Sequence, residues 1–265
     1  MPKQRDAIFA ELRQQEIVFI VNSNGRATVN ELCKHFSVSP ATIRTDLNEL
    51  ERLGTLKRTH GGAISNNNIL NYEPTSQEKE EQHVSQKKAI ANAALGYVKP
   101  GDTIAIDTGT TTMEFAKAIV SIPNLTVVTN DLLIATFLEQ SSNTTVILLG
   151  GYVRPHFHCT IGQGVVDALT PLHIDTAFMA TNGISAECGL STPNMEMASI
   201  KREMIKCSKN VVLLVDSSKI GKNALIIFAT FDKVNVIITD DGADSGFVRT
   251  VEESNVKVVF TKPEE

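Results

Sequence analysis

The spacing of apolar residues predicts two helices in the first part of the chain. Residues 3–23 contain neither proline nor glycine, and Ile17, Ile20 and Val21 lie at helical spacing before Asn24-Gly25 provides a stop. A second helix is predicted to begin at Thr28-Val29-Asn30-Glu31, which has the pattern of a capping box. Its apolar face is predicted to consist of Val29, Leu32, Cys33 and Phe36.

A third helix is predicted to begin at Ser39, which caps it, with Pro40 at the first helical position, where proline loses no hydrogen bond. Gly54 is placed to end this helix. Its buried stripe is predicted to consist of Ile43, Leu47, Leu50 and Leu53. Two short helices joined by a tight turn, the second with polar residues opposite a narrow apolar stripe, are what a helix-turn-helix requires.

The segment that follows, from Leu56 to Ala63, is basic and contains the pair Gly61-Gly62. We expect a strand that turns at the double glycine, and a hairpin at this place forms the wing of a winged helix-turn-helix. An ordinary three-helix core is the alternative interpretation of the helices, and the basic hairpin favours the winged fold.

The remainder of the chain changes in character after this segment. Residues 64–84 are polar and poor in apolar side chains, so we predict a linker that passes into an exposed helix. From residue 103 onward, short runs of Val, Ile and Leu alternate with helical segments, which is typical of a mainly parallel sheet covered on both faces. Residues 85–265 are therefore predicted to form an α/β domain. The predicted strands are residues 103–106, 125–128, 146–149, 176–179, 211–215, 234–238 and 256–260.

Charge is distributed unevenly between the two predicted domains. The whole chain carries a formal charge of −5, which argues against a general nucleic-acid-binding protein. Residues 1–65, however, contain nine Lys or Arg and seven Asp or Glu, a net charge of +2, so the remaining residues carry −7. This asymmetry permits contact with DNA at the N-terminal end and disfavours it elsewhere.

Composition also excludes several classes of protein. The chain has no run of about 18 apolar residues and no secretory signal, so we expect a soluble, cytoplasmic protein without a membrane partner. Its four widely spaced cysteines favour reduced packing thiols over disulfides. His156, His158 and Cys159 lie within four positions and have no second cluster to complete a metal site. No metal is predicted, and because Walker and dinucleotide-binding motifs are absent, no cofactor is predicted either.

Several motifs together resemble the DeoR family of bacterial transcriptional regulators. In the N-terminal part these motifs are Ser39 to Leu47, Leu50 to Gly54 and Arg58 to Ala63. Further along they are Asp107-Thr108-Gly109-Thr110-Thr111-Thr112, Thr129-Asn130, Gly150-Gly151 with Arg154 and Gly162, Asn182-Gly183, and Asp216-Ser217-Ser218-Lys219. The resemblance spans nearly the whole chain, and the order and spacing of the motifs make it specific.

This resemblance implies a winged helix-turn-helix DNA-binding domain over residues 1–63 and a C-terminal domain similar in fold to ribose-5-phosphate isomerase and glucosamine-6-phosphate deaminase. It also implies repression of sugar or nucleoside utilisation genes, with a phosphorylated sugar as inducer. The sequence departs from the family at Thr45, where a second arginine is common. This change removes a long cationic side chain from the predicted groove-facing region.

Residues of the third helix and of the wing are the candidates for DNA contact. Arg44 is the strongest candidate for reading bases, because an arginine forms a bidentate pair with guanine. Its alternative role is an ion pair with Asp46 or Glu49. The wing residues are expected to contact phosphates or the minor groove, and a structural role is the alternative for His60. The candidates are Ser39, Thr42, Arg44, Thr45, Asn48, Lys57, Arg58 and His60.

The segment from Asp107 to Thr112 follows a predicted strand and opens a helix, so its backbone amides are placed to bind an anion. A plain turn capped by threonine is the alternative. Because ligands of α/β sheets bind outside the carboxyl ends of the strands, other motifs are expected to converge there. Among the charged candidates, Asp107 and Glu196 are expected to accept sugar hydroxyls, and Arg154 and Lys219 to neutralise a phosphate; the alternative for Arg154, Glu196 and Lys219 is solvated surface charge. The full candidate set is Asp107, Gly109, Thr110, Thr111, Thr112, Thr129, Asn130, Gly150, Gly151, Arg154, Asn182, Gly183, Glu196 and Lys219.

Two functions follow from these predictions. The first is a DNA-binding repressor of carbohydrate genes, active as a homodimer or homotetramer on double-stranded operator DNA and controlled by a sugar phosphate. The second is a sugar-phosphate isomerase or deaminase with an accessory DNA-binding domain, in which Asp107 or Glu196 acts as acid or base. The complete recognition helix and wing favour the regulator, because catalysis needs neither. An activator is a third possibility.

Overall fold

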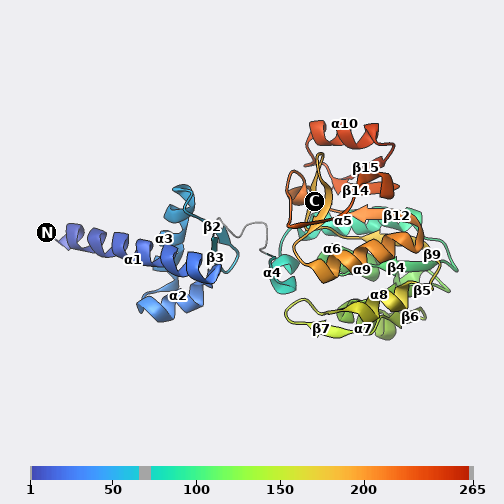
Figure 1. The fold of residues 1–265 in the computed structure, drawn as a ribbon, viewed down its shortest axis with the longest axis horizontal. Coiled ribbons are helices and arrows are strands. Elements are labelled where there is room, and N and C mark those ends of the chain that lie inside the picture. The colour runs from blue at the N-terminus through green and yellow to red at the C-terminus, as the bar shows by residue number, and fades with distance from the viewer. Residues whose placement is uncertain (1, 66–72, 263–265) are drawn as a thin grey trace. The chain divides into compact units, whose positions relative to one another are not determined.

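The computed structural model describes residues 2–65 and 73–262, and the side chains of these residues apart from 2–9 and 23. The chain divides into two compact units, Met1–Pro74 and Thr75–Glu265, and each is described by itself (Figure 1). Among the described residues, no helix combines the length and apolar character needed to cross a membrane.

Unit 1 contains the three helices that the apolar spacing predicts: α1 (Pro2–Asn24), α2 (Val29–Phe36) and α3 (Pro40–Arg52). The capping box at the start of α2 is present, because Thr28 and Glu31 each bond the other's backbone amide. At the start of α3, Ser39 Oγ accepts a hydrogen bond from the Thr42 amide at 3.2 Å. Local capping chemistry therefore sets where both helices begin.

The predicted wing is confirmed as an antiparallel hairpin of β2 (Leu56–Thr59) and β3 (Gly62–Ser65). A third strand, β1 (Arg26–Thr28), was not predicted and pairs with β3, which gives the sheet order β1-β3-β2. Gly62 is required at this place, since a Cβ there would lie 2.0 Å from the carbonyl oxygen of Ala27.

One predicted core residue of unit 1 is wrong. The side chain of Leu53 is 56% exposed, because α3 ends at Arg52 and the chain turns at Gly54, where φ is +70°. Leu56 at the start of the wing is buried instead. The rest of the predicted stripe, Ile43, Leu47 and Leu50, packs with Ile17 and Val21 of α1.

Unit 2 is built on a seven-stranded parallel sheet, and all seven predicted strands belong to it. The sheet order is β15-β14-β12-β9-β4-β5-β6, and each neighbouring pair is parallel. After β4 the chain adds β5 and then β6 on one side of the sheet, and from β9 it adds β12, β14 and β15 on the other side. The topological switch point therefore lies between β4 and β9. The strands are β4 (Thr103–Ile106), β5 (Thr126–Thr129), β6 (Thr145–Leu148), β9 (Ile174–Met179), β12 (Ser208–Leu214), β14 (Val236–Asp240) and β15 (Lys257–Thr261).

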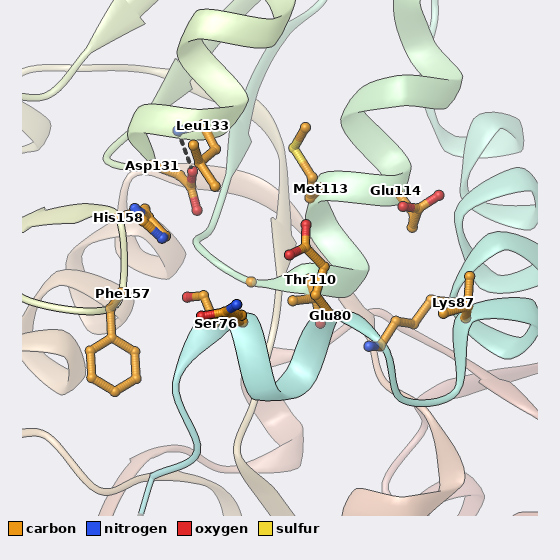
Figure 2. A pocket seen from close by; sticks show the side chains of 13 residues that line it. Ser76, Glu80, Lys87, Thr110, Met113, Glu114, Asp131, Leu133, Phe157 and His158 are labelled. Atoms are coloured by element: carbon orange, nitrogen blue, oxygen red, sulfur yellow. Dashed lines mark hydrogen bonds between the residues drawn. The ribbon is translucent and has the colours of Figure 1, made fainter. Parts of the chain in front are cut away.

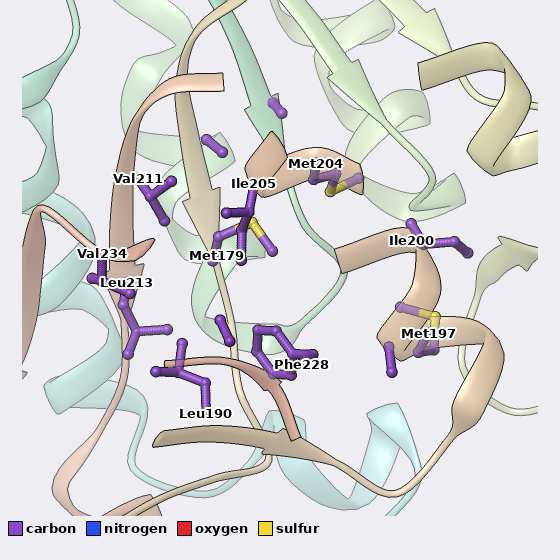
Figure 3. Close-up of a cluster of buried hydrophobic side chains, with 14 of the residues drawn as sticks. Met179, Leu190, Met197, Ile200, Met204, Ile205, Val211, Leu213, Phe228 and Val234 are labelled. Atoms are coloured by element: carbon purple, nitrogen blue, oxygen red, sulfur yellow. The ribbon is translucent and has the colours of Figure 1, made fainter. Parts of the chain in front are cut away.

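Helices cover both faces of this sheet and enclose two apolar cores. One core lies under α5 (Val84–Ala94), α6 (Thr110–Ala118) and α7 (Leu132–Ser141). The other lies under α8 (Gln163–Leu169), α9 (Met195–Lys206) and α10 (Ser245–Glu253), and Figure 3 shows part of it around Met179 and Phe228. The winged helix-turn-helix and the mainly parallel α/β domain predicted from the sequence are thus confirmed.

Several short elements were not predicted, since three or four residues give no clear periodicity. They form a hairpin, β7 (Tyr152–Arg154) with β8 (Cys159–Ile161), and a small sheet of β10 (Gly183–Ser185), β11 (Gly189–Thr192) and β13 (Ile226–Ala229). Short 3₁₀ helices are formed by Leu95–Tyr97, Ile119–Ser121, Ser217–Lys219 and Phe231–Lys233.

The predicted linker of residues 64–84 is partly structured. Residues 64 and 65 belong to β3, and residues 66–72 lie outside the described residues. A five-residue helix, α4 (Ser76–Glu80), follows and packs against α6. The helix expected at the end of this segment is thus present, and it packs against α6 within unit 2.

Candidate functional site

The exposed face of α3 presents Arg44, Thr45 and Asn48, opposite its buried stripe. At the start of the helix, the hydroxyls of Ser39 and Thr42 are hydrogen-bonded to each other at 2.9 Å. The two carboxylates nearest to Arg44 in sequence, those of Asp46 and Glu49, are bound to other arginines. Asp46 is buried and accepts two hydrogen bonds from Arg13 of α1, and Glu49 pairs with Arg52 at 2.6 Å.

Arg44 is consequently available for a partner outside the chain. Within the part of the chain that the structure describes, its guanidinium forms no ion pair and no hydrogen bond. The hydrogen bonds from Arg13 tie α1 to α3 and raise the pKa of the Arg13 guanidinium. The ion pair between Arg13 and Asp46 therefore stabilises the packing of α1 on α3, whereas Arg44 is exposed on the surface of α3.

The wing adds further cations beside this face. Lys57 is exposed on β2, and His60 is exposed in the turn that joins β2 and β3. Arg58 is bonded to α3, because its guanidinium donates to Asn48 Oδ1 and its backbone amide donates to Glu51 at 2.8 Å. The bond between Arg58 and Asn48 joins the wing to α3, so the predicted DNA-contacting residues lie on adjoining elements.

In unit 2, the segment after β4 opens α6 without a capping side chain. Asp107 is fully buried and accepts hydrogen bonds from the amides of Thr108 and Ala180, both at 2.9 Å, while the ammonium of Lys201 pairs with it. In the described chain the amides of Thr110, Thr111 and Thr112 have no protein acceptor. Three free amides at the positive end of a helix are suited to bind an anion.

A pocket of about 250 Å³ lies at the start of α6, where Gly109 and Thr110 line it (Figure 2). It is enclosed by α4, the start of α5, the first turns of α6 and α7, and the loop between β7 and β8. Its lining residues are Ser76, Gln77, Glu80, Val84, Lys87, Gly109, Thr110, Met113, Glu114, Asp131, Leu133, Phe157 and His158.

The principal cation of this pocket is Lys87, which is only 4% exposed. Burial lowers the pKa of its ammonium to about 8, the nearby carboxylate of Asp216 opposes this shift, and Lys219 adds to it. Lys219 of the predicted set therefore lies in the electrostatic field of the same site. A lysine buried beside uncapped amides is suited to bind a phosphate group.

The principal carboxylate of the pocket is Asp131, at the start of α7. Its Oδ1 accepts hydrogen bonds from the amides of Leu133 and Ile134, and its Oδ2 accepts one from the Thr108 hydroxyl at 2.7 Å. Burial raises the pKa of Asp131. The pocket thus offers an acceptor close to the anion site, as binding of a hydroxylated ligand requires.

The comparisons with known proteins match both units of the chain. A family model described as "DeoR C terminal sensor domain" matches residues 82–241, more than half of the chain. A second model, "DeoR-like helix-turn-helix domain", matches residues 13–68. The chain belongs to the DeoR family. The resemblance predicted from the sequence motifs is thereby confirmed.

Curated relatives of this DeoR-family protein span nearly its whole length. The HTH-type transcriptional regulator GlpR of Haloferax volcanii is 34% identical over 93% of this chain and 96% of its own. The regulator YulB of Bacillus subtilis, itself uncharacterized, is 38% identical over 93% of this chain and 95% of its own. The glycerol-3-phosphate regulon repressor of Escherichia coli is 34% identical over 86% and 90%.

Solved structures resemble this chain only weakly, both in sequence identity and in TM-score. The ribose 5-phosphate isomerase of Plasmodium falciparum is 17% identical and covers 52% of this chain and 54% of its own, with a TM-score of 0.38. The eIF2B beta subunit of Chaetomium thermophilum is 15% identical over 58% and 48%, with a TM-score of 0.41. These values carry no argument about function.

The pocket of this DeoR-family protein contains only part of the predicted effector set. Gly109 and Thr110 line it. Thr111, Thr112, Thr129 and Asn130 are buried behind it. Thr129, for example, donates to the carbonyl of Ile106 at 2.7 Å and accepts from the Asp131 amide at 3.0 Å, so it fixes the ends of β4 and β5.

Other predicted residues lie outside the pocket lining and make local contacts. The guanidinium of Arg154 stacks 3.7 Å from the ring centroid of Phe157, which itself lines the pocket. Glu196 accepts a hydrogen bond from the hydroxyl of Tyr152, and Asn182 accepts one from Thr192 at 3.0 Å. Gly150 is exposed, whereas Gly151 and Gly183 allow close packing: a Cβ would lie 2.4 Å from the Ile161 oxygen at Gly151 and 2.5 Å from the Lys222 oxygen at Gly183.

Sequence reasoning missed Lys87 and Asp131. A signal for Lys87 was present, because it shares an apolar helical stripe with Ile90, Ala91 and Ala94, all of which are buried. A lysine on such a stripe indicates either a buried functional side chain or a position at the solvent-exposed edge of the stripe. Among the described residues, no group of three or more His, Cys, Asp and Glu side chains is arranged to hold a metal ion.

Proposed function

We propose that this protein is a transcriptional repressor of carbohydrate-utilisation genes whose affinity for operator DNA changes when a phosphorylated sugar binds unit 2. The observation that carries this proposal is the uncapped start of α6 beside the buried ammonium of Lys87. Backbone amides and one lysine supply the donors that a phosphate monoester needs. Relatives named as repressors, including one of a glycerol-3-phosphate regulon, support repression over activation and a phosphorylated ligand.

The DNA-binding part of the proposal assigns base recognition to Arg44 of α3, with Thr42, Thr45 and Asn48 beside it. Ser39 and the wing residues Lys57, Arg58 and His60 contact the phosphate backbone. In support, both carboxylates nearest to Arg44 in sequence are bound to other arginines. The wing contacts are independent of sequence and weaken as salt is raised.

The test measures binding of full-length protein to fragments from upstream of carbohydrate genes, by fluorescence anisotropy. Glycerol 3-phosphate, fructose 1-phosphate, fructose 6-phosphate and glucosamine 6-phosphate are added in turn. At least one of them is expected to weaken specific binding, whereas its unphosphorylated counterpart is without effect. If none of the panel alters operator affinity, control by these ligands is refuted.

We also propose that unit 2 is a sensor without catalytic activity. Asp107, the carboxylate that the sequence suggested as a general base, is fully buried and paired with Lys201, and Glu196 is bound to Tyr152. Neither is free to move a proton between carbon atoms of a sugar. Incubation of the full chain with fructose 6-phosphate and ribose 5-phosphate, followed by NMR, is expected to show no turnover.

Finally, we propose that the protein acts as a homodimer or homotetramer in the cytoplasm, where its operator lies. Helix-turn-helix proteins read two half-sites about one helical turn apart by matching the symmetry of the DNA. Light scattering of the free protein and of its operator complex tests this proposal, and a monomer bound to a single half-site would contradict it.

A further inference from the structure

Helix α4 is five residues long, and its position depends on contacts with the rest of unit 2. A helix of this length is not stable alone, since nucleation costs more than its few hydrogen bonds return. Its first turn is closed by the capping box of Thr75 and Glu78, and the Ser76 amide donates to the carbonyl of His156 at 3.3 Å. The position of α4 therefore depends on tertiary contacts, and these hydrogen bonds are among them.

The other end of α4 is held by Lys87. Its Nζ donates a hydrogen bond to the carbonyl oxygen of Lys79, and the Lys79 ammonium lies 5.6 Å from the ring centroid of Phe157. Figure 2 shows the Lys87 side chain directed from α5 toward α4. An ammonium has three donors, and the described residues provide no second acceptor for this one.

The remaining donors of Lys87 are placed for a ligand, because Lys87 lines the same pocket as the start of α6. Ser76, Gln77 and Glu80 of α4 line it from the other side. A ligand bound here lies between α6 and α4. An anion that takes a hydrogen bond from Lys87 also fixes the ammonium that holds α4, so occupancy and the order of α4 are linked.

Helix α4 is also the first element of unit 2. Its N-cap, Thr75, is the first residue of that unit, and the last strand of unit 1 ends at Ser65. The chain segment that joins the two units therefore ends at α4. Helix α4 is thus the element of unit 2 that lies nearest in sequence to the DNA-binding unit.

We propose that α4 is the coupling element of this regulator and that Lys87 is its positioning residue. The Lys87 ammonium is shared between the Lys79 carbonyl and an anion bound at the start of α6, so that occupancy of the site fixes α4, the first element of unit 2. This inference rests on the proposed effector site, and it adds the path by which that site acts.

Amide hydrogen exchange of the full-length protein tests the proposal, with inorganic phosphate as the probe and chloride to keep the ionic strength constant. Phosphate is expected to slow exchange both at residues 110–113 and at residues 77–82. In Lys87→Met, the amides of residues 77–82 are expected to exchange about tenfold faster without phosphate, which corresponds to one charge-assisted hydrogen bond, and to lose their response to phosphate. Lys88→Met, at the exposed neighbouring position, is the matched control and is expected to behave like the wild type.

The outcomes separate this inference from the proposed function. Protection of residues 110–113 without any change at residues 77–82 overturns the coupling role of α4 and leaves the anion site standing. An undiminished response of residues 77–82 in Lys87→Met overturns the role of Lys87. If phosphate protects neither segment, the anion site itself fails, and the inference fails with it.

Discussion

The start of α6 permits a test that removes one backbone donor and leaves the helix intact. Thr110 is the first residue of α6, and Gly109 before it has φ of +158° and a ψ of 162°, which is the extended ψ that a following proline needs. Proline is tolerated at the first helical position, and it requires an extended residue before it. Thr110→Pro therefore deletes the Thr110 amide N–H while the remaining helical hydrogen bonds are kept. Thr110→Ala is the control, since it removes the same side chain and retains the N–H.

The size of the effect follows from the charge of the ligand. A hydrogen bond from a backbone amide to a charged group contributes about 1.5–3 kcal/mol. Loss of one such bond is expected to weaken binding of a sugar phosphate by about 10- to 150-fold in Thr110→Pro relative to Thr110→Ala. The ring Cδ of the proline also occupies the place of the N–H hydrogen, so the ratio combines the lost hydrogen bond with the closer approach of this carbon to the ligand.

The assay is isothermal titration calorimetry of full-length protein with the sugar phosphate that weakens operator binding, or with inorganic phosphate. Circular dichroism and thermal unfolding of both variants check that α6 is preserved. Equal affinity of the two folded variants would refute the assignment of the phosphate to the start of α6. An unphosphorylated sugar, which lacks the anion, is expected not to distinguish them.

Three other predictions concern the DNA face, the pocket lysine and the core. Arg44→Ala is expected to cost about 1–3 kcal/mol of operator affinity and to relax base preference at one position, whereas Arg52→Ala, on the same helix, leaves base preference unchanged; anisotropy with operator variants measures both. Because the pKa of Lys87 is lowered to about 8, this side chain loses its charge as pH rises from 7 to 9. The affinity for sulfate, whose own charge is constant in this range, is therefore expected to fall about tenfold. An affinity that does not change with pH would contradict this prediction, and such a constant affinity is expected for the control variant Lys87→Met. Lys201→Met leaves the buried carboxylate of Asp107 unpaired and is expected to lower the free energy of unfolding by about 3–5 kcal/mol in urea denaturation, with partial recovery in the double variant that adds Asp107→Asn.

Local sequence determined the principal helices of unit 1 and the strands of the large sheet in unit 2. The capping chemistry at Thr28 and Ser39 gives the starts of α2 and α3, because each cap uses groups only three residues apart. The seven strands of the large sheet were predictable as runs of β-branched and aliphatic residues, since strands buried on both faces need apolar side chains throughout. The start of α6 was predictable for the same local reason, as a strand followed by glycine and threonines.

The tertiary structure decided which of these residues meet. Asp107 has the sequence context of a ligand-binding carboxylate, yet its partner Lys201 is 94 positions away, and that pairing turns it into part of the core. Lys87 and Asp131 enter the pocket because α4, α5 and α7 pack around the start of α6, an arrangement that depends on strand order and not on local spacing. Periodicity reports which side of an element is buried, whereas contact between distant elements follows from their packing. The sequence therefore indicated a candidate anion site, and the fold brought a lysine and a carboxylate into the pocket beside it.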